Sequence, residues 1–137
     1  MLTNRDKRFF EITRLISYTS EYKRIKIGAI VVKKNKIISV GVNSYKTHPI
    51  QRRYNIFRFN IFTTDTAHTL HAEIQALVNI PYGTELSDLT LYTYRENRDG
   101  KLAKSRPCPS CMNLIKDIGI KKICYTTDEG YAIEYLK

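Results

Sequence analysis

The feature that most constrains this chain is a pair of short motifs, each at the start of a segment with the pattern of a helix. His71-Ala72-Glu73 opens segment 70–80, where apolar residues recur at helical spacing until Pro81. Pro107-Cys108-Pro109-Ser110-Cys111 opens segment 108–118. Two cysteines three residues apart on a helix share one face, and the free N–H groups of a first turn favour their thiolate forms. With His71 as a third ligand, one metal ion would keep a fourth position open, as catalytic rather than structural zinc does.

Each motif alone has a structural interpretation. A CxxC can be half of a four-cysteine zinc site or a redox pair, and a His-x-Glu can be two polar residues on a helix surface. Cys124 is the only other cysteine, so one chain cannot supply four thiolates. The CxxC also lacks the βαβ opening expected of a thioredoxin-like protein. Taken together, the motifs favour a metal centre of His71, Cys108 and Cys111, with Glu73 beside it.

The periodicity of the chain predicts an α/β fold in a single domain, 1–137. Residues 3–20 have a helical period, with Thr3 and Asp6 spaced as a capping box. Strands are expected over 27–32, 37–42, 89–94, 120–126 and 131–136, the first two as a hairpin well inside a sheet. The short link at 128–130 favours an antiparallel last pair. The order α-β-β-α-β-α-β-β predicts a mixed five-stranded sheet with helices on both faces.

No apolar run in the chain approaches the length of a membrane span, and the first ten residues are polar and charged, unlike a signal peptide. We therefore expect a cytoplasmic protein. A hydrophobic fraction of 42%, with ten Tyr and five Phe, is sufficient for a folded core.

The connection from Asn43 to Thr69 has no clear period, which in a small domain indicates a functional loop or a hidden helix. It overlaps a stretch, Tyr22 to Thr64, that carries ten Lys and Arg and no acidic residue, in a chain of net charge +10. Such a stretch attracts anionic ligands, although some of its lysines are explained equally well as solvated surface residues. Its aromatic residues could stack on bases or form a packed lid or subunit interface: Tyr54, Phe57, Phe59 and Phe62.

The two motifs together resemble the H-x-E and P-C-x-x-C signature of the cytidine and deoxycytidylate deaminase superfamily, and most of the chain, about 3–126, is similar to that family. Ile27–Val32 resembles the family's first strand, and Gly41-Val42-Asn43 resembles the end of its second. The resemblance implies a three-layer α-β-α cytidine-deaminase-like fold, a bound Zn²⁺ and a homo-oligomer. It also implies that Glu73 moves protons, that Asn43 contacts the sugar of a substrate, and that the backbone N–H of Ala72 contacts the base.

Two features depart from the family pattern. Family members commonly pass from the third strand to the PCxxC within a few residues, whereas here residues 95–106 intervene, with five basic and two acidic residues. We therefore expect the mouth of the site to be rebuilt. An antiparallel last strand would resemble the free-cytidine branch, while the His-Ala-Glu motif and Asn43 resemble the deoxycytidylate, transfer-RNA and polynucleotide branches.

Three functional hypotheses follow from these observations. The first is hydrolytic deamination of a cytosine-containing nucleotide of the dCMP kind, with the phosphate held by a basic cluster: Lys46, His48, Arg52 and Arg53. The second is a deaminase of single-stranded DNA or RNA, acting on cytosine or adenine and favoured by the long basic stretch and its aromatics. The third is a nucleic-acid-binding module with a structural zinc and no catalysis.

Overall fold

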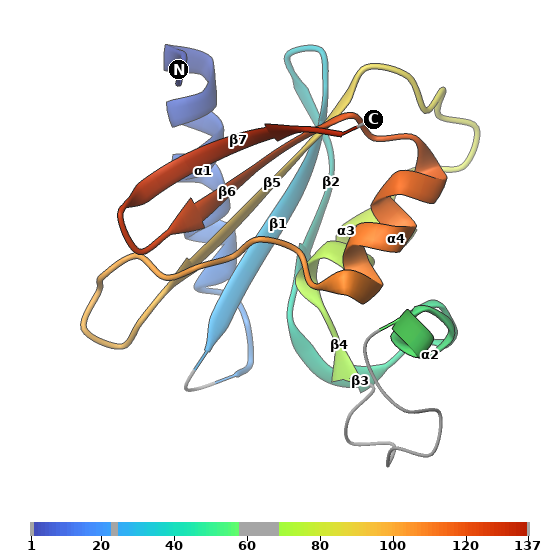
Figure 1. Ribbon diagram of the computed structural model, residues 1–137, viewed down its shortest axis with the longest axis horizontal. Helices are drawn as coiled ribbons and strands as arrows, with labels where there is room; N and C mark the ends of the chain where they lie inside the picture. Colours follow the sequence, from blue (N-terminus) through green and yellow to red (C-terminus); the bar gives the residue numbers. More distant parts are fainter. Residues whose placement is uncertain (1, 23–24, 58–68, 137) are drawn as a thin grey trace.

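The computed structural model describes residues 2–22, 25–57 and 69–136, in which helices and strands are mixed along the chain (Figure 1). The helices are α1 (Asn4–Ser17), α2 (Pro49–Tyr54), the 3₁₀ turn η1 (Asn55–Phe57), α3 (Ala72–Val78) and α4 (Pro109–Ile118). The strands are β1 (Lys26–Lys33), β2 (Lys36–Val42), β3 (Ser44–Thr47), β4 (Thr69–Leu70), β5 (Leu89–Glu96), β6 (Lys122–Thr127) and β7 (Gly130–Tyr135). Of the helices in these ranges, none has the length and apolar character needed to cross a bilayer.

Five strands form one mixed sheet in the order β2-β1-β5-β6-β7. β1 pairs antiparallel with both β2 and β5, β5 pairs parallel with β6, and β6 pairs antiparallel with β7. This confirms the mixed five-stranded sheet and its antiparallel last strand. The expectation that both strands of the first hairpin lie inside the sheet is wrong for β2, which is an edge strand. Its buried positions result from cover by a helix rather than from a second neighbouring strand.

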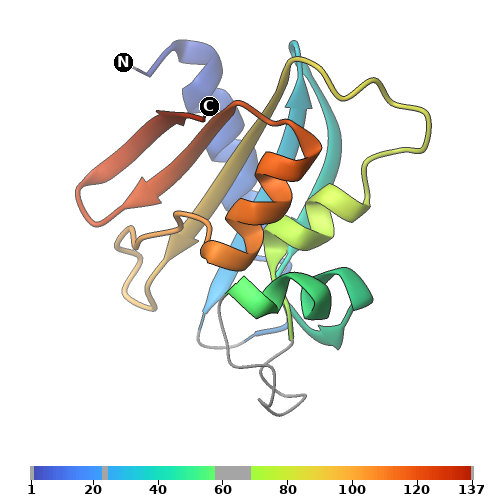
Figure 2. The ribbon, with the colours of Figure 1, turned by 45° about the vertical axis from the view of Figure 1, so that its right-hand side comes forward.

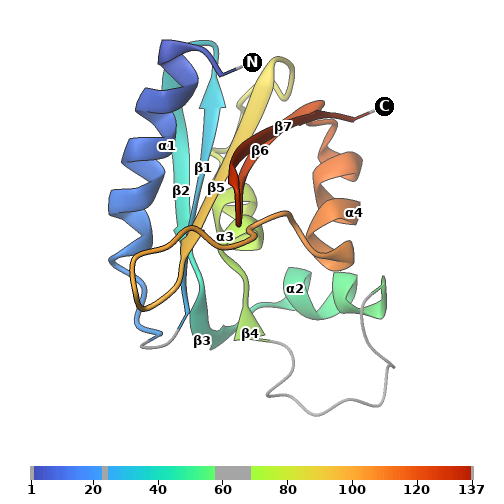
Figure 3. The ribbon, with the colours of Figure 1, turned by 60° about the vertical axis from the view of Figure 1, so that its left-hand side comes forward.

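Helices cover both faces of the sheet, giving the three layers of an α-β-α fold (Figure 3). α1 packs on one face through Phe9 and Phe10, against Ile30 and Tyr92 of the sheet. α3 and α4 pack on the other face, where a larger cluster joins apolar side chains of both helices to those of β1, β5 and β6. Side chains of a strand alternate between faces, so each central strand contributes to both clusters.

Two glycines allow helices to approach the sheet closely. A Cβ on Gly28 of β1 would lie 2.7 Å from backbone atoms of Thr13 and Ser17 in α1. A Cβ on Gly41 of β2 would lie 2.4 Å from the carbonyl oxygen of Ala72, at the first residue of α3. Both distances are too short for a side chain. Gly41 therefore sets how near the start of α3, and the motif there, can lie to the sheet.

The connection after Asn43 contains a helix that the sequence pattern did not reveal. His48 caps α2, because its Nδ1 accepts a hydrogen bond from the Ile50 N–H at 3.0 Å. α2 packs against α4 (Figure 2), and Tyr54 at the end of α2 donates a hydrogen bond to Asp117, in the last turn of α4, at 2.5 Å. Tyr54 also packs against the larger core cluster, which supports the packed-lid interpretation for this ring. Phe59 and Phe62 lie outside the described residues.

The predicted capping box at the start of α1 is present and continues into a buried network. Thr3 Oγ1 accepts from the Asp6 N–H at 3.0 Å, and Asp6 Oδ2 accepts from the Thr3 N–H at 3.2 Å. The other carboxylate oxygen accepts from the Tyr92 hydroxyl at 2.6 Å and lies 3.4 Å from Lys122 Nζ. Burial acts to raise the pKa of Asp6, but these hydrogen bonds and Lys122 outweigh it and bring the pKa below 3.8.

This network gives α1 a pH-dependent link to β5 and β6. Because the pKa of Asp6 is lowered on folding, its stabilising contribution is present above 3.8 and is lost as the pH falls below that value. We expect Asp6→Asn to lower the free energy of unfolding by about 1–3 kcal/mol at neutral pH. The difference in the free energy of unfolding between Asp6→Asn and wild type, measured by urea unfolding, should become smaller at about pH 3. Glu129→Gln, in the exposed β6–β7 turn, is the control and should change neither curve; a pH-independent Asp6→Asn effect would contradict the assignment.

Candidate metal centre

His71, Cys108 and Cys111 come together at the ends of two helices, as the motifs predicted. Their ligand atoms all lie within 4.8 Å of one another. His71 Nδ1 is 3.5 Å from the sulfur of Cys108 and 3.3 Å from that of Cys111, and the two sulfurs are 3.7 Å apart. A tetrahedral zinc ion, with bonds of about 2.3 Å to sulfur and about 2.0–2.1 Å to nitrogen, requires S···S near 3.8 Å and N···S near 3.5 Å. The donor set and its spacing therefore fit Zn²⁺ with three protein ligands.

Local helix geometry explains why these side chains converge. His71 is the N-cap of α3, Cys108 is the N-cap of α4, and Cys111 lies in the first turn of α4. Neither side chain makes a capping hydrogen bond at its helix, and the two lie against each other where the helices begin. The positive ends of two helices at one point also stabilise thiolates.

The two cysteines differ in their affinity for a proton. The pKa of Cys108 is lowered to about 3, chiefly because of the hydrogen bond between its sulfur and that of Cys111, and also because His71 lies beside it. The same bond, together with burial, raises the pKa of Cys111 well above its ordinary value. Without a metal, the pair therefore holds one thiolate and one thiol.

Two glutamines hold the start of α3 in place, and sequence reasoning missed both. Gln51 of α2 is fully buried, and its Oε1 accepts from the His71 backbone N–H at 2.9 Å. Its Nε2 donates to Asn55 Oδ1 at 2.8 Å. Gln75 accepts from the Val42 N–H at 2.7 Å and so ties α3 to β2. Gln51 lies in a segment without a period, so no pattern could have marked it as buried.

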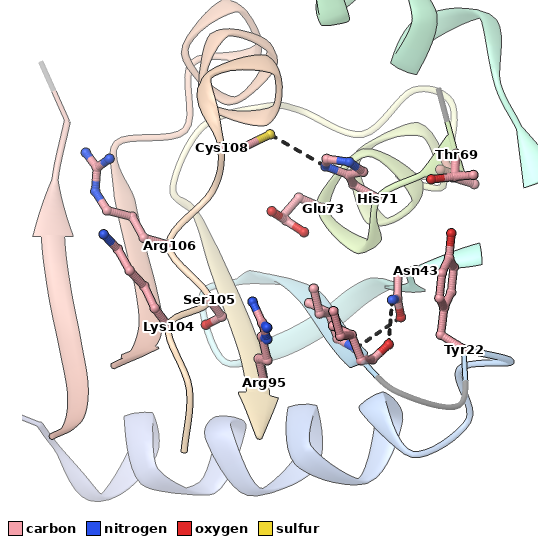
Figure 4. A pocket seen from close by; sticks show the side chains of 13 residues that line it. Tyr22, Asn43, Thr69, His71, Glu73, Arg95, Lys104, Ser105, Arg106 and Cys108 are labelled. Atoms are coloured by element: carbon pink, nitrogen blue, oxygen red, sulfur yellow. Dashed lines mark hydrogen bonds between the residues drawn. The ribbon is translucent and has the colours of Figure 1, made fainter. Parts of the chain in front are cut away.

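Glu73 lies beside the cluster but is not one of the three clustered donors. Glu73 is only 6% exposed, and this burial is the main reason that the pKa of its carboxyl group is raised. Figure 4 shows its carboxylate directed into the same space as His71 and Cys108. This is the position that a proton carrier, rather than a ligand, requires.

A cavity of about 290 Å³ opens in front of these groups (Figure 4). Its walls include His71, Glu73, Cys108 and Asn43, together with Tyr22, Ile25, Ile27, Thr69, Leu70, Arg95, Lys104, Ser105 and Arg106. Small-ligand sites span about 300–1,000 Å³, so the cavity is at the lower limit for one small molecule. It combines apolar walls with a few polar and charged groups.

Asn43 lines the cavity, but most of its hydrogen-bonding capacity is used within the protein. Its Oδ1 accepts from the Ile27 N–H at 3.0 Å and from the Ser20 hydroxyl at 2.5 Å, and its Nδ2 donates to the Ile25 carbonyl at 2.8 Å. A sugar contact would have to use the second hydrogen of Nδ2. Ala72 is fully buried at the first position of α3 and is not part of the cavity wall.

The expected phosphate cluster is not found at this cavity. Lys46, Arg52 and Arg53 are exposed, His48 is used as the cap of α2, and none of the four belongs to the cavity wall. The physical reason for Arg52 and Arg53 is the hidden helix, which packs against α4 and carries both side chains away from the wall, whereas Lys46 lies on β3. Three cations of the inserted segment 95–106 lie there instead: Arg95, Lys104 and Arg106. The length and charge of that segment indicated a rebuilt mouth without identifying these residues.

Comparison with known proteins identifies the relatives of this chain. The family model for the cytidine and deoxycytidylate deaminase zinc-binding region matches residues 3–127. An uncharacterized deaminase encoded in the luxG 3′ region of Aliivibrio fischeri is 28% identical over 123 residues, covering 90% of this chain and 73% of that protein. The deoxycytidylate deaminase of Mycobacterium phage D29 is 27% identical over 129 residues, covering 88% and 92% respectively.

Solved structures give the same grouping. The dCMP deaminase of cyanophage S-TIM5, in complex with dCMP and dUMP, is 30% identical with a TM-score of 0.62, covering 91% of this chain and 82% of that one. A cytidine deaminase from Burkholderia pseudomallei is 15% identical with a TM-score of 0.65, covering 98% and 93%. At that identity the second likeness concerns the fold alone.

The cluster predicts about one zinc ion per chain in the purified protein, measured by inductively coupled plasma mass spectrometry. Cys111→Ser should weaken zinc binding by more than the 10- to 100-fold typical of outer-shell changes, because a ligand is lost. Cys124→Ala is the matched control, since that buried thiol packs on the α1 side of the sheet. Loss of zinc in the control, or its retention in Cys111→Ser, would contradict the site.

Proposed function

The chain belongs to the cytidine and deoxycytidylate deaminase family. From that premise we propose that it removes, by hydrolysis, the amino group from the base of a cytosine-containing nucleotide of the dCMP kind. The products are the uracil nucleotide and ammonia. The observation that carries the proposal is the cluster of His71, Cys108 and Cys111 with buried Glu73 beside it. His71, Cys108 and Glu73 line a cavity of about 290 Å³. Oligomerisation with further copies of the chain stays a prediction.

In this proposal His71, Cys108 and Cys111 hold the metal, and Glu73 handles the protons. Zn²⁺ held there supplies Lewis acidity, which makes water a nucleophile near neutral pH. Glu73 accepts a proton from the attacking water and delivers it to the ring nitrogen. It then takes the second proton of that water, from the new hydroxyl group, and delivers it to the amino group that leaves as ammonia. The balance is one water consumed for each ammonia released. Two thiolates offset the charge of the ion, so a separate base is useful at this site.

A free nucleotide is favoured over a polymer by the shape of the site. The cavity is near the lower limit for a small ligand, and the cations in its wall lie next to the reacting groups. The cyanophage neighbour is described with dCMP and dUMP, which supports the same substrate class here. A polynucleotide is the second candidate, because Lys46, Arg52 and Arg53 form an exposed basic surface outside the cavity that could follow a backbone.

Glu73→Gln should keep the zinc content and the fold but lower kcat by about 10²–10⁴-fold, because the amide cannot carry the proton. Ammonia release from dCMP is the measurement, with zinc content determined on the same sample. Glu129→Gln, on an exposed turn, is the matched control and should match wild type. Retained turnover in Glu73→Gln would exclude the proton-transfer role.

The substrate class is tested by a panel of cytidine, dCMP, dCTP and a single-stranded oligonucleotide containing cytosine. We expect turnover of dCMP, with a KM that rises as salt is added because a charged contact is screened. An oligonucleotide bound along the basic surface would show a much steeper salt dependence. Turnover of the oligonucleotide but not of dCMP would contradict the preference for a free nucleotide.

A further inference from the structure

Arg95 occupies a position where the strand pattern calls for an apolar side chain. On β5, Leu89 and Leu91 face the core cluster of α3 and α4, and alternation places Thr93 and then Arg95 on that same face. Arg95 lies opposite Ile27 of β1 in the strand register, and both residues line the cavity. Arg95 is therefore the last residue of an inward-facing row. Figure 4 shows its side chain in the same cavity wall as Glu73 and Cys108, across the open space from them.

The Nε–H of Arg95 is a donor that the described residues leave unused. Its Nε is buried and has no hydrogen bond, and Arg95 makes no ion pair within residues 2–22, 25–57 and 69–136. A guanidinium stays charged under all ordinary conditions. Arg95 as a whole is half-buried. A buried donor without an acceptor is costly, so its unused Nε–H is explained by an anion that binds there.

The other two cations of the cavity wall differ from Arg95. Arg106 is already paired with Glu134, with its Nε and Nη2 each 3.0 Å from a carboxylate oxygen. Lys104 is exposed, so water screens its charge. Arg95 is therefore the cation of this wall that combines burial with an unused donor.

Hydroxyl groups fix the inserted segment beside Arg95. The Thr93 hydroxyl donates to the Ser105 carbonyl at 2.9 Å, and Ser105 Oγ accepts from the Thr126 N–H at 2.8 Å. The Arg95 carbonyl accepts from the Ala103 N–H at 3.0 Å, which closes the segment into a hairpin-like arm. The segment that follows Arg95 is thus bonded to both β5 and β6. These bonds fix the backbone from which the Arg95 side chain extends.

Resting on the proposed function, we infer that Arg95 binds the 5′-phosphate of the substrate and so makes the enzyme specific for a nucleotide over a nucleoside. A guanidinium can offer Nε–H and one Nη–H side by side to two phosphate oxygens. The cavity accepts the base at Glu73 and places the phosphate toward β5. The inserted segment, where this chain departs from its family, would then set specificity for the phosphate.

The test compares dCMP with deoxycytidine in Arg95→Gln, Arg95→Lys and wild type. Arg95→Gln should raise KM for dCMP by about 10- to 100-fold, the value of a lost charge-assisted hydrogen bond, and leave kcat/KM for deoxycytidine unchanged. Arg95→Lys should fall between, because it keeps the charge but not the paired donors. Arg98→Gln, exposed on the same segment and outside the cavity wall, is the matched control.

Equal losses for both substrates would overturn the inference in favour of a structural role, as would an unchanged KM for dCMP. A loss confined to oligonucleotide substrates would also overturn it, by assigning Arg95 to a phosphodiester. Calorimetric titration of dCMP into Glu73→Gln and Glu73→Gln/Arg95→Gln gives a readout independent of turnover. If wild type deaminates no cytosine substrate, the proposed function fails, while weaker dCMP binding in the double variant would still support Arg95 as the phosphate contact.

Discussion

The meeting of two helix N-termini at one point is the constraint on which the rest of this structure depends. A single ion can be bound only if α3 and α4 begin within a few ångströms of each other, and the three donor atoms do lie within 4.8 Å. The sheet makes this possible, because α3 and α4 pack side by side on one face over a shared core. Gly41 lets the start of α3 approach β2, and Gln51 holds the His71 backbone from the far side. Any shift of one helix along the sheet would separate histidine from cysteines.

The elements that could be predicted from the sequence are those whose signal is local. The capping box of Thr3 and Asp6, the apolar strands and the CxxC at a helix start each depend on residues a few positions apart, and all are present. Features that depend on tertiary neighbours were missed or misplaced. The edge position of β2 depends on strand order, α2 has too few apolar residues for a visible period, and burial of Gln51 follows only from packing. The position of Arg52 and Arg53 away from the cavity is a consequence of that missed helix.

The sheet with its helices and the wall of the cavity compare differently with known proteins. The sheet and its helices are similar to those of a cytidine deaminase with a TM-score of 0.65, a likeness of the fold alone at 15% identity. Sequence identity near 30% instead links the chain to a dCMP deaminase. The segment 95–106 provides part of the cavity wall in this chain, and a hydroxyl network of Thr93, Ser105 and Thr126 fixes it to the sheet. The metal cluster thus lies on helices of the fold that this chain shares with its relatives. We assign the choice of substrate to the segment 95–106.

The most direct test of the central claim is a crystal structure of the purified protein with anomalous diffraction recorded on both sides of the zinc absorption edge. The account predicts one anomalous peak bonded to His71 Nδ1 and to the sulfurs of Cys108 and Cys111, with Glu73 facing a fourth corner that no protein atom fills. A zinc ion with a side chain as its fourth ligand, or no anomalous peak at this cluster in undamaged protein, would contradict it.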